Sequence, residues 1–387
     1  MKQGWEIKKL GEVFDLQMGK TPSRDNGDYW GGDNVWVAIS DLQDKYIGES
    51  KEHITDKALT ETKIKKVKAG TTIMSFKLSV GRAAITTKDL YTNEAIMAFN
   101  LNEGYDLIAD YIYYYLKGYK WQGANKAAMG LTLNKTSISQ NYIVIPPRAE
   151  QERIVAELDC LSGVIEKKRE QLRELDALAQ SIFYQMFGDP ITNEKGWEVK
   201  KLGEVCDVRD GTHDSPKYLE YSDYILITSK NITNDGNIDF STANYISKED
   251  YDVINKRSYV ESGDIIMAMI GTIGKPIIVK ETDKKFCIKN VALIKFGCST
   301  MVINTYIKAM LNNPDYGQYI QSQNKGGTQK FVALGTIRNL PILLPSIEIQ
   351  QQFADKIEAI EKQKALIKQS ITETETLFNA RMAYYFN

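Results

Sequence analysis

The sequence is poor in the residues that most often carry metal and nucleophilic chemistry. It contains two histidines, His53 and His213, in 387 residues. Its four cysteines lack C-x-x-C spacing and stand at Cys160, Cys206, Cys287 and Cys298. This pattern indicates reduced structural thiols and not a zinc site or a disulfide framework. So few histidines argue against His-based catalytic triads and His-rich metal sites, and we expect no metal and no cofactor.

The sequence also lacks long apolar runs and an excess of charge of either sign. No run approaches the roughly 20 apolar residues that a membrane span requires, and the first residues lack the apolar core of a signal peptide, so we expect a cytoplasmic protein. Lysine and arginine number 49 against 50 aspartates and glutamates, a net charge of −1. Bulk charge therefore does not indicate a nucleic-acid-binding protein. If DNA is the ligand, positive charge must be focused locally or supplied partly by a partner.

What the chain does have is an internal repeat. Residues 4–13 read G-W-E-I-K-K-L-G-E-V, and residues 196–205 read G-W-E-V-K-K-L-G-E-V. Each copy opens a globular half that ends in a long helical pattern. Two such halves predict approximate two-fold symmetry within one chain, which suits a two-part target such as duplex DNA.

The halves match beyond their openings, and each is expected to be α+β with a mixed sheet. A helix or turn carrying Trp-Glu should come first, followed by an apolar strand and a loop rich in glycine, threonine and proline. β-Branched runs bounded by turn residues predict further strands. The expected strands cover residues 13–16, 35–41, 70–74 and 142–147 in the first half, and 205–208, 224–231, 263–267 and 342–345 in the second. Helical patterns cover residues 107–116 and 303–311.

Heptad spacing predicts two long helices, each with an apolar seam. The two seams comprise Ile154, Leu158, Leu161, Ile165, Leu172, Leu175, Ile182 and Met186, and Phe353, Ile357, Ile360, Ile367, Ile371, Phe378 and Tyr385. Polar residues interrupt them at different places, so pairing of the two helices as an antiparallel coiled coil is favoured. Separate packing of each helix on its own domain is the alternative. The expected domains are residues 1–149 and 188–347, with helices at 150–187 and 348–387.

The entry to the first helix makes the organisation specific. Residues 146–154 read P-P-R-A-E-Q-E-R-I, and the second entry, at residues 344–353, departs mildly but keeps Gln350 and Phe353. Together with the repeated G-W-E-x-K-K-L-G-E-V opening, this order resembles the specificity subunit of a type I restriction–modification system, and the resemblance covers the whole chain.

The resemblance implies roles that composition alone does not. Each half would be a target-recognition domain that contacts double-stranded DNA, and the coiled coil would set their separation. Two methyltransferase subunits would dock around this spacer, with restriction/translocase subunits joining through them. Without the resemblance, the residues indicate only a pseudo-symmetric adaptor. The alternative is a scaffold that binds two copies of a protein partner and no DNA, which the near-neutral charge favours.

No catalytic constellation is evident. Residues 313–316 read N-P-D-Y, which differs from the D/N-P-P-Y/F tetrad of amino-methyltransferases at its third position, and no F-x-G-x-G motif accompanies it. Residues 269–276 approach a phosphate-binding loop, but Met269 replaces its first glycine and Pro276 its Ser/Thr. A helix-ending turn and a loop turn explain these segments better. We therefore expect a non-catalytic subunit.

Candidate DNA contacts are basic, amide and hydroxyl side chains in glycine-containing loops. Arg and Lys suit guanine, Asn and Gln suit adenine, and all can contact phosphate. For any one of them, a solvated loop side chain is the alternative. The first half offers Lys20, Thr21, Arg24, Lys77 and Arg82. The second half offers Thr212, His213, Lys217, Lys230, Asn231, Lys275, Asn324, Lys325, Thr328, Gln329 and Lys330.

The absence of a cofactor motif predicts that the purified chain neither methylates nor cuts DNA by itself. Isothermal calorimetry with S-adenosylmethionine should give no binding heat, because no glycine-rich loop is present to hold the cofactor. Binding of S-adenosylmethionine to the isolated chain would overturn the non-catalytic assignment.

Overall fold

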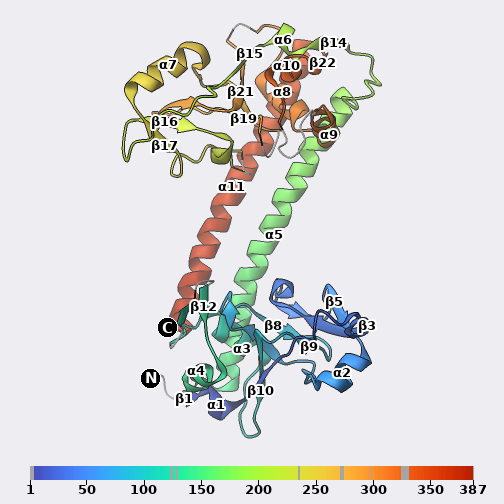
Figure 1. The fold of residues 1–387 in the computed structure, drawn as a ribbon, viewed down its shortest axis with the longest axis vertical. Helices are drawn as coiled ribbons and strands as arrows, with labels where there is room; N and C mark the ends of the chain where they lie inside the picture. Colours follow the sequence, from blue (N-terminus) through green and yellow to red (C-terminus); the bar gives the residue numbers. More distant parts are fainter. Residues whose placement is uncertain are drawn as a thin grey trace. The chain divides into compact units, whose positions relative to one another are not determined.

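The computed structural model describes residues 4–122, 125–127, 130–233, 236–270, 274–297, 299–323 and 331–386 (Figure 1). The chain divides into two compact units. Unit 1 comprises residues 1–169 and 369–387, and unit 2 comprises residues 170–368. Two 40-residue helices, α5 (Arg148–Phe187) and α11 (Ile347–Phe386), contribute residues to both units. None of the helices in the described ranges is both long and apolar enough to cross a bilayer.

Among its described residues, unit 1 contains short helices and four sheets of short strands. Its strands are β1 (Glu6–Lys9), β2 (Phe14–Met18), β3 (Trp30–Val37), β4 (Tyr46–Ile47), β5 (Glu52–Ile54), β6 (Thr72–Ser75), β7 (Lys77–Leu78), β8 (Ala83–Thr86), β9 (Tyr91–Thr92), β10 (Ile96–Leu101), β11 (Asn125–Ala127), β12 (Gly130–Thr132) and β13 (Tyr142–Ile145). Its shorter helices are α1 (Leu10–Val13), α2 (Asp56–Thr62), α3 (Ala109–Gly118) and α4 (Lys135–Gln140), with 3₁₀ turns at Gly27–Tyr29 and Ile39–Asp41. The sheets have the orders β2-β10-β6-β8-β4, β5-β3-β9, β11-β12-β7 and β1-β13.

Unit 2 repeats this plan. Its strands are β14 (Glu198–Lys201), β15 (Asp207–Asp210), β16 (Tyr224–Ile227), β17 (Asn244–Ile246), β18 (Ile265–Ala268), β19 (Gly274–Ile278), β20 (Lys285–Ile288), β21 (Val291–Lys295) and β22 (Pro341–Leu344). Its shorter helices are α6 (Leu202–Val205), α7 (Lys248–Ser258), α8 (Asn304–Leu311), α9 (Pro314–Ser322) and α10 (Leu334–Arg338), with a 3₁₀ turn at Ser229–Asn231. The sheets have the orders β15-β21-β18-β19, β17-β16-β20 and β14-β22.

The two units share a sheet order, which confirms the predicted α+β repeat. The order β2-β10-β6-β8 corresponds to β15-β21-β18-β19, and the pairs β3·β9 and β16·β20 are parallel among mainly antiparallel neighbours. The expected helix or turn carrying Trp-Glu is wrong. Glu6 and Glu198 begin strands β1 and β14, which pair with the closing strands β13 and β22. These residues form strands because they pair with a strand that is distant in sequence, which the local sequence pattern does not show.

Helix α3 carries much of the unit 1 core. Its four tyrosines are buried, and the hydroxyl of Tyr111 donates to the carbonyl of Val144 at 2.9 Å. The core is completed by residues from the two long helices. Ile154 and Leu158 from the start of α5 join Phe386 from the end of α11, whose ring lies edge-on to that of Tyr111.

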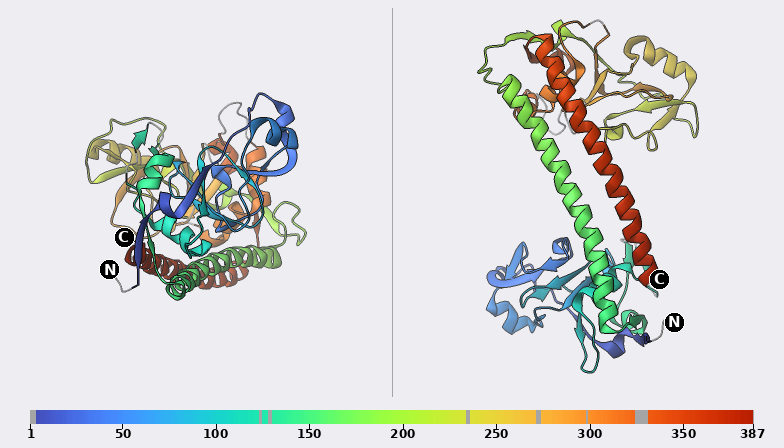
Figure 2. Two further views of the ribbon diagram at one scale, coloured as in Figure 1. Left: turned by 90° about the horizontal axis from the view of Figure 1, so that it is seen from below. Right: turned by 180° about the vertical axis from the view of Figure 1, so that it is seen from behind.

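The unit 2 core has the same construction, with the helix ends exchanged. Phe183 and Phe187 from the end of α5 join Phe353 from the start of α11. The ring centroids of Phe187 and Phe353 are 5.1 Å apart, and Tyr306 of α8 packs 4.7 Å from Phe187. In both units, therefore, one end of α5 lies against the opposite end of α11, an antiparallel arrangement (Figure 2).

The predicted seams lie on the less exposed faces of the long helices. Each of the named seam residues is buried or half-buried. Polar residues within the seams find partners on the other helix of the same unit. The ammonium of Lys168 contacts the hydroxyl of Ser370 in unit 1, and Lys364 pairs with Asp176 at 2.8 Å in unit 2.

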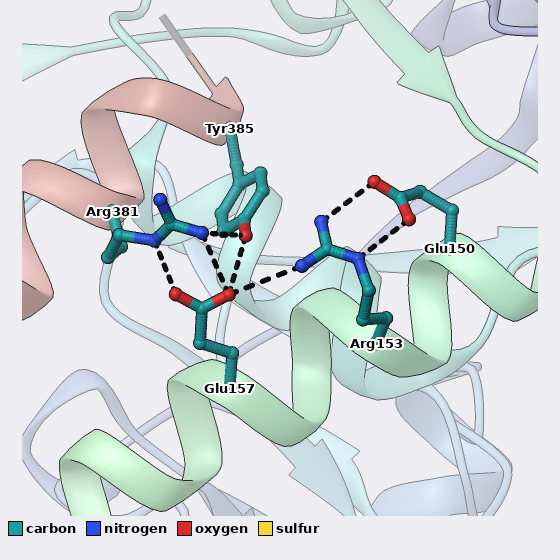
Figure 3. Close-up of polar contacts among 5 residues, drawn as sticks. All are labelled: Glu150, Arg153, Glu157, Arg381 and Tyr385. Atoms are coloured by element: carbon teal, nitrogen blue, oxygen red, sulfur yellow. Dashed lines mark hydrogen bonds and ion pairs between the residues drawn. The ribbon is translucent and has the colours of Figure 1, made fainter.

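A polar cluster joins the start of α5 to the end of α11 within unit 1 (Figure 3). Glu157 accepts hydrogen bonds from Arg381 at 2.9 Å and from the hydroxyl of Tyr385 at 2.6 Å. Arg153 lies 3.4 Å from the same carboxylate and pairs with Glu150 at 2.8 Å. The hydrogen bond from Arg381 is the main cause that lowers the pKa of Glu157 from its ordinary value.

This cluster predicts a pH-dependent contribution to the stability of unit 1. Because the pKa of Glu157 is lowered in the folded state, its contribution is present above the unfolded pKa and is lost as the pH falls through the folded pKa. Glu157→Gln should therefore melt below the wild type at pH 7. The difference in melting temperature should shrink as the pH falls from about 5 to below 4. Lys167→Gln, on the exposed face of α5, is the control. An unchanged difference across this range would show that the carboxylate does not supply the effect.

Candidate nucleic-acid interface

In unit 1, three segments that follow strand ends meet at one edge. The loop after β2 is fixed to the turn after β9, because the amide of Lys20 donates to the carbonyl of Thr92 at 2.8 Å. The turn after β9 is also held to the end of β3, because the amide of Asn93 donates to the carbonyl of Val37 at 3.0 Å. Parallel pairing of β3 and β9 brings both strand ends to this edge. We call residues 19–24, 38–41 and 92–94 the first turn cluster.

Unit 2 builds the same edge from equivalent hydrogen bonds. The amide of Thr212 donates to the carbonyl of Ile288 at 3.0 Å, and the amide of Lys289 donates to the carbonyl of Ile227 at 2.8 Å. Strands β16 and β20 are the parallel pair here. We call residues 211–217, 228–231 and 288–290 the second turn cluster. The two clusters therefore present different side chains on a common backbone frame.

Glycine is required where the loop crosses the turn. A Cβ atom on Gly19 would lie 2.2 Å from the carbonyl oxygen of Asn93, and one on Gly211 would lie 2.3 Å from that of Ile288. Neither distance leaves room for a side chain, and the blocking atoms belong to the backbone. The close approach fixes the position of the residues that follow each glycine.

The side chains predicted in the first turn cluster are held by neighbours. The ammonium of Lys20 donates to the carbonyl of Thr62 at 2.6 Å, and the hydroxyl of Thr21 contacts the carboxylate of Glu94. Arg24 pairs with both carboxylate oxygens of Glu52, the longer bond measuring 2.9 Å. The hydrogen bond to Glu52 raises the pKa of Arg24 above its ordinary value.

Arg24 is also stacked. Its guanidinium lies 3.9 Å from the ring centroid of Trp30, and the indole of Trp30 donates to the carbonyl of Ser23. An arginine so oriented presents a planar donor group with little remaining rotational freedom. Binding to phosphate or a base would require Arg24 to share its donors with Glu52 or to exchange that partner.

In the second turn cluster, His213 occupies the place that Thr21 has in the first. Its Nε2 lies 2.9 Å from a carboxylate oxygen of Asp210, and its Nδ1 lies 2.9 Å from the side-chain oxygen of Asn290. Asp210 is itself 4% exposed and also pairs with Arg257. The hydrogen bond with Asn290 is the main cause that raises the pKa of His213 above its ordinary value, and Asp210 adds to it, while burial and Arg257 oppose the shift.

The structure gives Asn231 a different role from the predicted one. It is 4% exposed, and its side-chain oxygen accepts the amide of Thr228 at 2.9 Å, which closes the 3₁₀ turn. Asp41 makes the same bond to the amide of Ala38 in unit 1. Asn231 is therefore a turn-forming residue whose amide is used inside the domain. Its neighbour Lys230 is exposed on the surface of the same turn.

The remaining predicted residues lie elsewhere or outside the described ranges. Thr212 caps its own loop by accepting the amide of Asp214, and Lys217 lies exposed further along it. Lys77 and Arg82 flank a separate turn after β6. Lys275 was expected in a loop, but it lies in β19 beside a register shift and has a positive φ of 54°. Asn324, Lys325, Thr328, Gln329 and Lys330 fall outside the described residues.

Several residues of the clusters were missed by sequence reasoning. Glu94 and Asn290 contact the predicted Thr21 and His213, and the ammonium of Lys289 contacts the hydroxyl of Ser215. A further signal was available in the repeat, because the turns after β9 and β20 follow equivalent strands. The turn lengths differ by one residue, which hides the correspondence. Within the described ranges, no group of three or more His, Cys, Asp or Glu side chains could hold a metal ion.

Comparison with known proteins finds similarity along both halves. The family model described as "Type I restriction modification DNA specificity domain" matches residues 2–176 and 194–376. The type I restriction enzyme MjaIX specificity subunit of Methanocaldococcus jannaschii is 26% identical over 92% of this chain and 86% of its own length. The EcoBI specificity subunit of Escherichia coli is 23% identical over 65% of this chain and 58% of its own length.

Two solved structures share the fold. The S subunit of a type I restriction–modification system from M. genitalium superposes with a TM-score of 0.54 at 13% identity, covering 99% of this chain and 96% of that one. A chain from a structure of type I R-M complex assembly and conformational transition gives 0.62 at 17% identity, covering 100% and 98%. At these identities, the likeness supports the fold alone.

The geometry around His213 predicts a measurable titration. Asn290→Ala should lower the pKa of His213, because it removes the first hydrogen bond that favours the protonated ring. A raised folded-state pKa stabilises the folded chain below the unfolded pKa, and this stabilisation is lost as the pH rises through the folded pKa. Ring NMR resonances report the titration directly, and His53→Gln assigns the two histidines. An unchanged pKa in Asn290→Ala would show that this contact does not set it.

Proposed function

The chain belongs to the type I restriction–modification DNA specificity family, and we propose that it reads a bipartite, asymmetric site on double-stranded DNA. The observation that carries this proposal is the duplicated turn cluster. Lys20, Thr21 and Glu94 stand in the first frame, where Thr212, His213 and Asn290 stand in the second. Equivalent frames with different donors and acceptors suit two half-sites of different sequence.

Under this proposal the chain supplies specificity and not catalysis. Two methyltransferase subunits would dock around the paired helices and modify the site, and restriction/translocase subunits would join through them in the cytoplasm. The net charge of −1 fits this division, because the partners would supply part of the attraction to phosphate. The candidate contacts in the chain itself are the predicted residues of the two turn clusters other than the buried Asn231. Lys77, Arg82 and Lys275 in separate segments, and residues 324–330, are further candidates.

The salt dependence of binding separates this proposal from a protein scaffold that does not bind DNA. The chain with its methyltransferase should bind duplex DNA with an affinity that falls steeply as the salt concentration rises, because each phosphate contact releases counterions. Lys20→Gln and Lys230→Gln should each reduce the slope of log affinity against log salt by about 1 if each contacts one phosphate. Lys167→Gln, on the exposed face of α5, should leave the slope unchanged. No duplex binding at low salt would favour the scaffold.

We propose that the two long helices act as a ruler that sets the distance between the half-sites. Deletion of one heptad from each helix tests this proposal. A heptad spans about 10 Å at roughly 1.5 Å per residue, and apolar seam residues should keep the shortened helices in register. Methylome sequencing of a host that carries the variant should show fewer unspecified base pairs between unchanged half-sites. Exchange of residues 1–149 for those of another family member should change one half-site only. A heptad deletion that altered the bases read, but not their spacing, would contradict the ruler.

A further inference from the structure

Each long helix is joined to its globular half through one fully buried glutamine. In unit 1 this residue is Gln151, in the first turn of α5 and 0% exposed. Its side-chain nitrogen donates to the carbonyls of Asp106 at 2.7 Å and Pro146 at 2.9 Å. Its side-chain oxygen accepts the amide of Ile108 at 3.0 Å. One side chain therefore connects three segments: the helix, the end of the closing strand and the start of α3.

Unit 2 contains the same joint. Gln350 lies in the first turn of α11 and is also 0% exposed. Its nitrogen donates to the carbonyls of Met301 at 2.9 Å and Pro345 at 3.0 Å, and its oxygen accepts the amide of Ile303 at 2.9 Å. The glutamine follows its proline by five residues in both halves. The shared P-x-x-x-x-Q spacing of the two helix entries thus has a structural cause.

The chemistry of the joint requires a neutral amide. Two carbonyls and one amide N–H converge on the side chain, and a primary amide offers two donors and an acceptor. Ile108 and Ile303 are the N-cap residues of α3 and α8, and neither supplies a side-chain cap. Apolar packing is not directional, whereas hydrogen bonds are, so three bonds fix the angle between segments more narrowly than packing alone.

We propose that Gln151 and Gln350 are positioning residues that fix the angle at which each recognition domain leaves its long helix. This inference rests on the proposed function, in which the helices set the spacing of two half-sites. A helix can transmit that spacing to DNA only if the domain does not rotate on it. The two glutamines hold this angle independently, one for each half-site.

The first test measures spacer selectivity in the complex of the full chain with its methyltransferase. Duplexes would carry the two half-sites at the native spacing or with one base pair more or fewer. The wild type should prefer the native spacing, and Gln151→Met should reduce that preference by about tenfold, because a rotating domain loses affinity at the native spacing and gains it at others. Gln350→Met should act alike through the second half-site. Tyr111→Phe, which loses one hydrogen bond at the same joint, is the matched control and should keep the preference.

The second test measures the joint without DNA. Nitroxide labels at the exposed Cys160 and at Lys51→Cys, with Cys298→Ser, report the distance between α5 and the first domain by pulsed electron resonance. The wild-type distribution should be narrow, and Gln151→Met should broaden it. Gln350→Met should leave it unchanged, because that residue belongs to unit 2. A narrow distribution in Gln151→Met would overturn the inference.

Gln151→Glu is a second variant in case Gln151→Met does not fold, and it separates a positioning role from a general loss of stability. An ionised carboxylate cannot donate to the carbonyls of Asp106 and Pro146, but a protonated carboxyl can donate to one of them. The Gln151→Glu distribution should therefore narrow as the pH is lowered from about 8 to 5, since burial raises a carboxyl pKa, while the wild type stays constant. A distribution that does not respond to pH would count against the inference. If the wild-type complex fails to bind any duplex, the proposed function is wrong, and the label distances still decide the role of the glutamine.

Discussion

The apolar core of each globular half includes residues from the start of one long helix and the end of the other. Phe386 and Met382, at the end of α11, lie in the core that the first half begins, and Phe183 and Phe187, at the end of α5, lie in that of the second. Burial of large side chains is the main favourable term in folding. Pairing of the two helices is therefore part of the stability of each unit and not an addition to it. The antiparallel direction follows, because each core needs the start of one helix and the end of the other.

The two places where helix ends meet differ in chemistry. In unit 1 the contact combines apolar burial with the carboxylate of Glu157, held by Arg381 and Tyr385. In unit 2 it is aromatic, with Phe353 against Phe183 and Phe187. A polar end does not suit an aromatic one, because the carboxylate would lose its partners on burial. The two units thus share an architecture, but the contacts between their helix ends differ. This difference favours one register of the paired helices over others.

Sequence reasoning predicted the features that periodicity and repetition control. The heptad seams located both long helices to within a few residues. Contacts that depend on distant pairing were not predictable in this way. The strand after Trp5 forms because β13 lies beside it, and Asn231 is buried because its amide closes a turn. A polar loop has the same local composition whether its side-chain amide faces solvent or the interior of the domain.

The candidate interface illustrates the same limit. Glycine-rich loops identified where the turn clusters lie, because Gly19 and Gly211 are needed for close backbone approach. Their partners Glu94 and Asn290 lie more than 70 residues further along the chain. A single sequence does not show which distant turn faces a loop, so the turns that carry Glu94 and Asn290 were missed. The buried glutamines were visible as part of a motif, but their bonds to three separate segments were not.

The division of unit 1 between both ends of the chain has a consequence for biosynthesis. Residues 1–169 leave the ribosome first, yet the aromatic and polar groups of residues 369–387 that complete their core are made after the whole of unit 2. The contacts of α3 and α5 with Met382 and Phe386 can therefore form only after unit 2 has been synthesised. Unit 2, by contrast, has all of its residues available once Lys368 has been added. Unit 1 is therefore begun first, but its last residues are the last to be made.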